Sequence, residues 1–236
     1  YLRNGSWEWQ NIENIKSLVE SGQIKSKIFL DVGANIGFFS CNLLNHFEDI
    51  LAFEPHPIAN HVLNANALLV SQLSKNKEVL KTFPIAIGQE NDEIFISSGE
   101  AYNALARVST TQLENSFKVK VKTLSSFFDE DVNLNAKDIS VIKIDVEGFE
   151  INVLKGMVKI LEKYQPLLLV EMKEIENNSE ILNILHKYNY RYFYSYKMKF
   201  FNTVFGIKPV MKLLDTNDLN KNSYQLVYFS KYSITW

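Results

Sequence analysis

The stretch that decides the fold of this chain is Ile28-Phe29-Leu30-Asp31-Val32-Gly33-Ala34-Asn35-Ile36-Gly37-Phe38-Phe39-Ser40. A short apolar run of β-prone residues ends at an acid, passes through a turn with two glycines and leads into a helix. This order is typical of a first parallel strand whose carboxyl end holds a nucleotide-like ligand. The two glycines allow the backbone to approach a ligand closely, and Asn35 tolerates a positive φ better than most residues.

The glycine spacing distinguishes between two classes of ligand. Dinucleotide-binding proteins carry G-x-G-x-x-G, whereas this chain has G-x-x-x-G, with Asp31 two residues before the first glycine. A dehydrogenase normally has an apolar residue at this position. A carboxylate there suits a ligand with an ammonium group, such as S-adenosylmethionine. The residues predicted to bind this ligand along the turn are Asp31, Gly33, Ala34, Asn35 and Gly37.

A second strand, Ile50–Glu54, ends in a carboxylate about twenty residues later, where an acid can accept both hydroxyls of a ribose. Pro55 ends this strand, and the segment 83–88, which contains Ala86, is expected to lie against the adenine. Pro55 and Ala86 therefore complete the predicted cofactor site. Glu54 would serve NAD equally well, so a NAD-dependent oxidoreductase stays an alternative. Glu54 could also simply cap the following helix.

Length and composition fit one domain. The chain has 236 residues, of which 46% are hydrophobic, and this is enough to bury a full core. A net charge of −2 without a basic run argues against a nucleic-acid partner. The lone Cys41, the lack of a long apolar stretch and the lack of a visible signal peptide favour a cytoplasmic protein without a transmembrane segment. Since the chain begins at Tyr1, it can be a piece of a longer polypeptide.

Strands and helices alternate along the chain, which predicts an α/β fold with a mostly parallel sheet covered on both faces. Arg191–Lys197 and Gln225–Ser230 should close this sheet, joined by an irregular segment that includes Phe205–Pro209. Short strands at Ile94–Ser97 and Lys118–Val121 should flank a polar loop. The expected helices are Asn11–Ser21, Gly37–His46, Pro57–Val70, Gly148–Lys163 and Ser179–Lys187, the remaining core strands are Val79–Phe83, Val141–Val146 and Pro166–Met172, and the polar loop is Gly99–Ser116.

Two further strand ends carry charged residues. Lys143, Asp145 and Glu147 alternate along Val141–Glu150 and share a face if the chain stays extended, while Glu171 ends a neighbouring strand. The carboxyl ends of strands in an open α/β sheet face the ligand. We therefore expect one charged cluster there, in which Lys143 is more often a buried ion-pair partner than a proton acceptor.

Four ordered blocks resemble the FkbM family of methyltransferases. They are Asp31–Gly37, Phe53–Pro57, Ile142–Glu150 and Val153–Gly156. The resemblance implies a class I methyltransferase (Rossmann-like) fold, a three-layer sandwich with a mostly parallel seven-stranded sheet and an antiparallel C-terminal strand. The resemblance covers roughly Ile28–Glu171. With the length of the chain, we expect a helical lead-in at residues 1–26 and a single methyltransferase domain at residues 27–236. The resemblance also implies S-adenosylmethionine as methyl donor and a hydroxyl of a carbohydrate, glycan or related natural product as acceptor.

A sugar hydroxyl needs its proton removed before it attacks a methyl group. Asp145 and Glu171 are the leading candidates for this base and for positioning the acceptor, with Glu147 behind them. A divalent cation held by these carboxylates is a less favoured alternative, so no residue is assigned to a metal. A catalytically inactive cofactor-binding module is the third alternative.

Two other features have both a structural and a functional interpretation. His56 either approaches the adenosine or is a solvated residue in the first helical turn. The tyrosines of the tract Tyr190–Tyr196 all fall on one face of a strand, which predicts a half-buried strand. The alternative for this tract is a stacking surface for a sugar ring.

Overall fold

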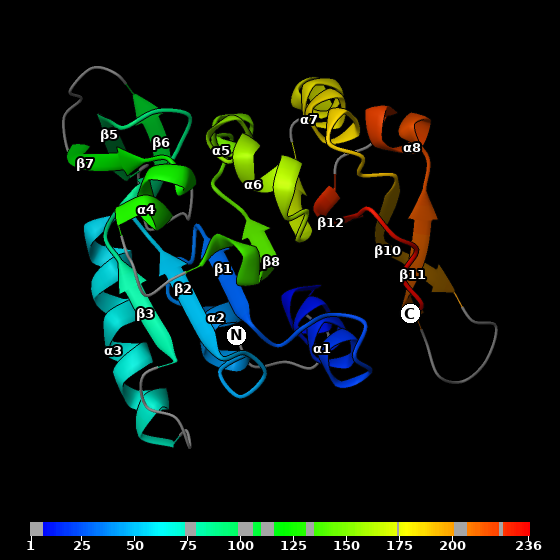
Figure 1. Cartoon of the computed structure of the whole chain (residues 1–236), viewed down its shortest axis with the longest axis horizontal. Helices are drawn as coiled ribbons and strands as arrows, with labels where there is room; N and C mark the ends of the chain where they lie inside the picture. The colour runs from blue at the N-terminus through cyan, green and yellow to red at the C-terminus, as the bar shows by residue number, and fades with distance from the viewer. Residues whose placement is uncertain are drawn as a thin grey trace.

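The computed structural model of the chain describes residues 7–73, 79–98, 106–109, 116–130, 135–173, 175–200, 207–221 and 224–236. Within these ranges the main sheet has the order β11-β10-β12-β9-β8-β1-β2-β3 (Figure 1). Strands β3, β2, β1, β8 and β9 pair in parallel, whereas β12, β10 and β11 follow with antiparallel pairings. The strands are β1 (Ile28–Val32), β2 (Asp49–Phe53), β3 (Leu80–Phe83), β8 (Ile139–Ile144), β9 (Leu167–Met172), β10 (Tyr192–Phe200), β11 (Ile207–Leu214) and β12 (Tyr224–Ser230).

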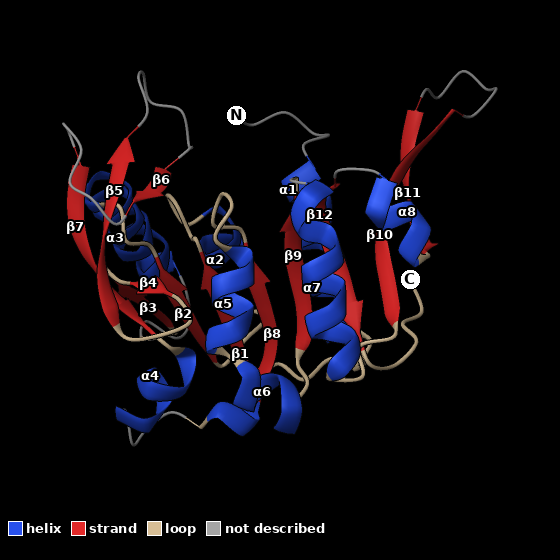
Figure 2. Ribbon diagram, turned by 90° about the horizontal axis from the view of Figure 1, so that it is seen from above, coloured by secondary structure: helices blue, strands red, loops and turns tan. Residues whose placement is uncertain are grey.

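Helices cover both faces of this sheet (Figure 2). Phe29 of β1 packs in the core beneath α1 and α2, while its neighbour Leu30 packs on the opposite side with α5, α6 and α7. This alternation follows from the two-residue period of a strand. Because both faces are covered, β1 and β9 are buried at every position. The helices are α1 (Trp7–Glu20), α2 (Phe38–Asn42), α3 (Pro57–Leu73), α4 (Leu124–Glu130), α5 (Glu150–Gly156), α6 (Val158–Lys163), α7 (Ile175–Lys187) and α8 (Thr216–Lys221), with a 3-10 turn at Ala136–Asp138.

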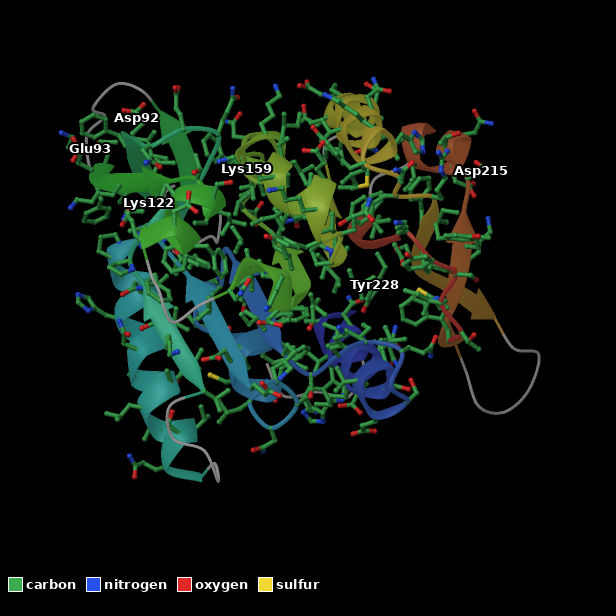
Figure 3. All side chains as sticks on the ribbon, viewed as in Figure 1. Asp92, Glu93, Lys122, Lys159, Asp215 and Tyr228 are labelled. Carbon is green, nitrogen blue, oxygen red and sulfur yellow. The ribbon has the colours of Figure 1, made fainter. Side chains whose placement is uncertain are left out.

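The first helix belongs to the core of the molecule. Ile12 and Ile15 of α1 are fully buried and pack in one cluster with Phe29. The hydroxyl of Tyr228, which Figure 3 labels, donates a hydrogen bond of 3.2 Å to the carbonyl of Asn11. Helix α1 is thus joined to both β1 and β12, and the domain boundary after residue 26 stays a prediction.

The class I α/β fold with a mostly parallel sheet is confirmed, and the C-terminal part is more elaborate than expected. The main sheet has eight strands in the described ranges rather than seven, because β11 pairs antiparallel with β10. Residues 207–209 of the segment expected to be irregular belong to β11. Pro209 lies on the outer strand of the sheet, where a missing N–H costs least.

A second, smaller sheet has the order β4-β7-β5-β6. Its strands are β4 (Ala86–Ile87), β5 (Asp92–Ser98), β6 (Ala106–Ser109) and β7 (Ser116–Lys122). The two short strands expected here are confirmed but longer, and they pair antiparallel as β5 and β7. Strand β6 lies inside the segment expected to be a polar loop, whose positions 99–105 and 110–115 lie outside the described residues.

Two expected helices differ from the structure. The segment predicted as one helix, Gly148–Lys163, forms α5 and α6, with a break at Met157. A Cβ on Gly156 would lie 1.8 Å from the carbonyl oxygen of Gly88, so the chain makes a close backbone contact where α5 ends. Helix α2 is shorter than the predicted Gly37–His46, and neither α4 nor α8 was expected. In the described ranges, none of the helices has the length and apolar character needed to cross a membrane.

The tyrosines of the tract do not all share one face as predicted, because Tyr190 precedes β10 and packs in the core cluster on the opposite side of the sheet from Tyr194. Tyr190 is fully buried and its hydroxyl donates to the carbonyl of Pro166 at 2.8 Å. The ring of Tyr194 is buried and lies 5.3 Å from that of Trp236. These rings are covered by the protein, so they do not offer the stacking surface considered as the alternative. The side chain of Tyr196 lies outside the described ones.

Candidate active site

The candidate site lies where β1, β8 and β9 end. Asp31, Lys143 and Glu171 occupy alternate strand positions that share the α1 and α2 face of the sheet with Phe29, Val141 and Leu169. Asp31 is paired in register with Lys143. All three side chains are almost completely buried, with exposures of 0% to 5%.

Asp31 is contacted by groups of the protein at both oxygens, but Oδ1 has no hydrogen-bond partner among the described residues. One carboxylate oxygen, Oδ2, accepts hydrogen bonds from the backbone N–H and the hydroxyl of Ser40, at 3.2 and 2.6 Å. The other, Oδ1, lies 3.2 Å from Nζ of Lys143. The structure thus gives Asp31 an ammonium partner within the chain. A direct contact between Asp31 and the methyl donor stays a prediction.

Lys143 links the ends of two strands by its charge. Its Nζ donates to the carbonyl of Gly33 at 3.1 Å and lies 3.5 Å from Oδ2 of Asp145. Burial on its own would lower the pKa of Lys143, but the carboxylates of Asp31 and Asp145 outweigh this effect and raise the pKa above its usual value. Lys143 is therefore a permanent cation, in agreement with its interpretation as an ion-pair partner.

The glycine turn is required first by the packing of the protein itself. Gly33 has a φ of +78°, and a Cβ there would lie 1.9 Å from the carbonyl oxygen of Asp145. At Gly37, with a φ of +87°, a Cβ would lie 2.6 Å from a methyl group of Leu63. Asn35 also has a positive φ, of 51°. A larger residue at Gly33 would collide with the chain before it met any ligand.

Glu54, just beyond the end of β2, is the group that best fits a ribose. Its Oε2 accepts from the backbone N–H of Asn35 and its Oε1 from that of His56, both at 2.8 Å. Burial raises the pKa of Glu54, and these two N–H groups partly oppose the rise. Each carboxylate oxygen keeps a lone pair for a further donor, so the carboxylate can cap the turn and still bind two hydroxyls.

The surroundings of His56 also fit an adenosine group. Its Nε2 is buried and has no hydrogen-bond partner in the described part of the chain. The ring lies edge-on to Phe117 of β7 at 5.2 Å, and burial lowers the pKa of His56, which favours the neutral imidazole. Pro55 is half-buried beside it. The side chain of Ala86, by contrast, packs in the core of the small sheet, so only its backbone is available to a ligand.

The structure brings together Asp145, Glu147 and Glu171, but the chain does not stay extended as the alternation assumed, because β8 ends at Ile144 and Glu147 has a positive φ of 52°. One carboxylate oxygen from each lies within 4.8 Å of the others, a spacing that could also hold a metal ion. Burial and the neighbouring Asp145 raise the pKa of Glu171 to about 8, partly opposed by a hydrogen bond from Lys173. A carboxylate with such a pKa is a suitable proton acceptor near neutral pH.

Two residues of the site were missed in the sequence. Lys173 lies 2.6 Å from Glu171 and 3.1 Å from Glu147. It follows Glu171 by two positions, so the same alternation placed it on this face. Glu8, which is exposed in the first turn of α1, has Lys143 and Asp145 as its main electrostatic neighbours. The sequence near Glu8 does not indicate that the start of α1 lies at the ends of β8 and β9, so Glu8 cannot be assigned to the site from sequence alone.

Two curated methyltransferases are similar to this chain over part of its length. Hexuronic acid methyltransferase AglP of Haloferax volcanii is 32% identical over 152 residues, which cover 63% of this chain and 56% of that protein. Methyltransferase sdnD of Sordaria araneosa is 30% identical over 162 residues, 54% of this chain and 59% of that protein. The chain thus spans somewhat more than half the length of these relatives.

A solved structure shows the same fold. The methyltransferase FkbM of Methylobacillus flagellatus superimposes with a TM-score of 0.53 at 16% identity, covering 89% of this chain and 45% of that one. The sequence profile of the methyltransferase FkbM domain matches residues 31–192, which include the glycine turn, Glu54 and all three acids of the cluster. The chain therefore belongs to the FkbM family of methyltransferases.

Proposed function

We propose that the chain transfers a methyl group from S-adenosylmethionine to a hydroxyl of a carbohydrate, glycan or related natural product. The observation that carries this proposal is the cluster of Asp145, Glu147 and Glu171, one strand away from the glycine turn. The family implies the donor, and the name of the relative AglP, a hexuronic acid methyltransferase, supports a sugar acceptor.

Glu54 and the turn from Gly33 to Gly37 would hold the donor. The free lone pairs of Glu54 suit the ribose hydroxyls, and His56, two residues later, has a ring nitrogen with no hydrogen-bond partner among the described residues. When bound, S-adenosylmethionine supplies an activated methyl group on a positively charged sulfur. The chain must align the acceptor oxygen with that methyl group, and such alignment supplies much of the rate.

Glu171 is the residue that would accept the proton of the acceptor hydroxyl. It is buried, and its pKa of about 8 gives it higher proton affinity than an ordinary carboxylate. Asp145 is more exposed, with 27% of its side chain accessible, and would position the acceptor. Because Glu171 is buried and Asp145 is partly exposed, an acceptor hydroxyl would approach Glu171 from the side of Asp145.

A ligand experiment separates this function from the alternatives. S-adenosylhomocysteine, the product of the donor, should raise the melting temperature, whereas NAD should not. Glu54→Gln should reduce that shift, while Glu93→Gln on the exposed surface of the small sheet should leave it unchanged. Stabilisation by NAD instead would contradict the proposal and favour the oxidoreductase.

An activity experiment tests the acceptor and the acids. Neutral hexoses and hexuronates should be offered with labelled donor, and Asp145→Asn and Glu171→Gln should each lower turnover by about a hundredfold. Asp92→Asn is the matched control, since Asp92, which Figure 3 labels, is the first residue of β5 in the small sheet. Donor binding without transfer to any hydroxyl would instead indicate an inactive cofactor-binding module.

A further inference from the structure

Lys173, the residue that follows β9, makes the closest contacts in the carboxylate cluster. Its Nζ lies 2.6 Å from Oε1 of Glu171, and it donates to both oxygens of Glu147 at 3.1 and 3.2 Å. One ammonium group therefore bridges two of the three acids. Lys173 is the second lysine of the site, after Lys143, whose Nζ lies 3.5 Å from Asp145.

Three carboxylates at this separation need a positive charge. Each pair repels, and without a counter-ion the cluster would take up protons or move apart. Many enzymes place a divalent cation among such acids, where it fixes the oxygens and stabilises negative charge. Here the bridge formed by Lys173 meets the same need with a group of the chain.

The two acids that Lys173 joins lie in a strand and in a loop, respectively. Glu171 belongs to the fully buried strand β9. Glu147 lies in a loop with a positive φ of 52°, and this loop is closed by Glu150, whose Oε1 accepts from the N–H groups of Val146 and Gly148 at 3.3 and 3.1 Å. Lys173 therefore connects a fixed loop to the end of a fixed strand.

We propose that Lys173 is a positioning residue that serves as the built-in cation of this cluster, holding Glu147 and Glu171 in place where a divalent metal would otherwise be needed. The part of this inference that concerns turnover rests on the proposed methyl transfer. The part that concerns the charge of the cluster does not, because metal binding can be measured without an acceptor.

The first experiment measures Mn²⁺ binding by calorimetry to the metal-free protein. The wild type should bind no Mn²⁺ at the cluster, whereas Lys173→Met should bind it, because Glu147 and Glu171 then lose their shared lysine while Asp145 still lies within 4.8 Å of both. Lys155→Met is the matched control, since Lys155 is exposed to a similar extent as Lys173 (39% and 45%) but pairs with a single acid, Glu180, at 2.7 Å. Tight binding by the wild type that is lost in Asp145→Asn would overturn the proposal, because the cluster would then be a metal site.

The second experiment measures turnover with and without a chelator. The wild type should be unaffected, and Lys173→Met should lose about tenfold or more in kcat with an unchanged affinity for S-adenosylhomocysteine. Its pH profile should move to higher pH, Mn²⁺ should restore part of the rate, and Lys173→Arg should retain most of it. A lysine that only supported the fold would change none of the pH profile, the metal response or the arginine rescue.

The outcomes separate the two proposals. Loss of wild-type activity with the chelator and its return with Mg²⁺, or full activity of Lys173→Met with an unchanged pH profile, would contradict the role of Lys173. If no acceptor is methylated but only Lys173→Met binds Mn²⁺, the built-in cation is supported while the proposed methyl transfer fails.

Discussion

Lys143 and Lys81 show how differently the same ion pair behaves in two surroundings. Lys143 is 4% exposed and pairs with the buried Asp31, whereas Lys81 is largely exposed and lies 2.8 Å from Asp49. Lys143→Met would leave a buried carboxylate without its counter-ion and should lower the free energy of unfolding by about 3–5 kcal/mol. Urea denaturation monitored by circular dichroism measures this change.

Lys81→Met is the control for the buried pair. It should cost about 1 kcal/mol or less, since an exposed pair is screened by water. Equal losses in the two variants would show that Asp31 is better solvated than its burial indicates.

The pH dependence of turnover follows from Glu171. Only the deprotonated carboxylate accepts a proton, and its pKa is raised to about 8. The value of kcat/KM should therefore rise as the pH increases from 6 and level off above about 8, whereas an ordinary carboxylate would already be deprotonated at pH 6. A pH profile that is flat from 6 to 9 would assign the base to another residue.

At the scale of elements, the contact between α5 and the end of β4 predicts a stability change. A Cβ on Gly156 would lie 1.8 Å from the carbonyl of Gly88, and this is backbone that cannot rotate away. Gly156→Ala should therefore lower the free energy of unfolding by about 1–3 kcal/mol, although alanine is the better helix former. Lys155→Ala, on the exposed side of the same helix, is the control, and the measurement is again urea denaturation.

The sequence predicts well those elements whose own pattern of apolar and polar residues shows which faces are buried. Strands β1, β2, β8 and β9 are mostly apolar because both of their faces are covered. An acid lies next to the last residue of each of these strands. The break at Met157 and the pairing of β11 depend on contacts with distant backbone, which leave no periodic pattern. The shortening of α2 has no clear local signal either.

The candidate site follows the same division. The sequence predicts that Asp145, Glu147 and Glu171 cluster because they follow or end neighbouring strands, but Glu147 reaches the cluster through a loop with a positive φ rather than by strand alternation. The requirement for Gly33 was recognised, but its cause, the carbonyl of Asp145, comes from another strand. The ligand contacts of all these residues stay predictions.

At the scale of the whole molecule, the two sheets meet beside the proposed donor site. Phe117 of the small sheet lies against His56, which follows β2 of the main sheet. Strand β4 begins three residues after β3, so the small sheet is entered directly from the edge of the main one. The small sheet is therefore placed to form one wall of the proposed donor site.

The hydrogen bond from Lys143 to Gly33 joins residues 110 positions apart, and this separation has a consequence for the order of folding. Contacts between residues far apart in sequence form slowly, because the entropy cost of closing a long loop comes before the contact stabilises the chain. Helices such as α3 and α7 should form early, whereas the glycine turn reaches its final shape only when β1 has paired with β8. In refolding from urea, the far-ultraviolet signal should recover before the ability to bind S-adenosylhomocysteine, and simultaneous recovery would contradict this order. A chain released from the ribosome would then acquire its cofactor site last, so occupancy by the donor would report that folding is complete.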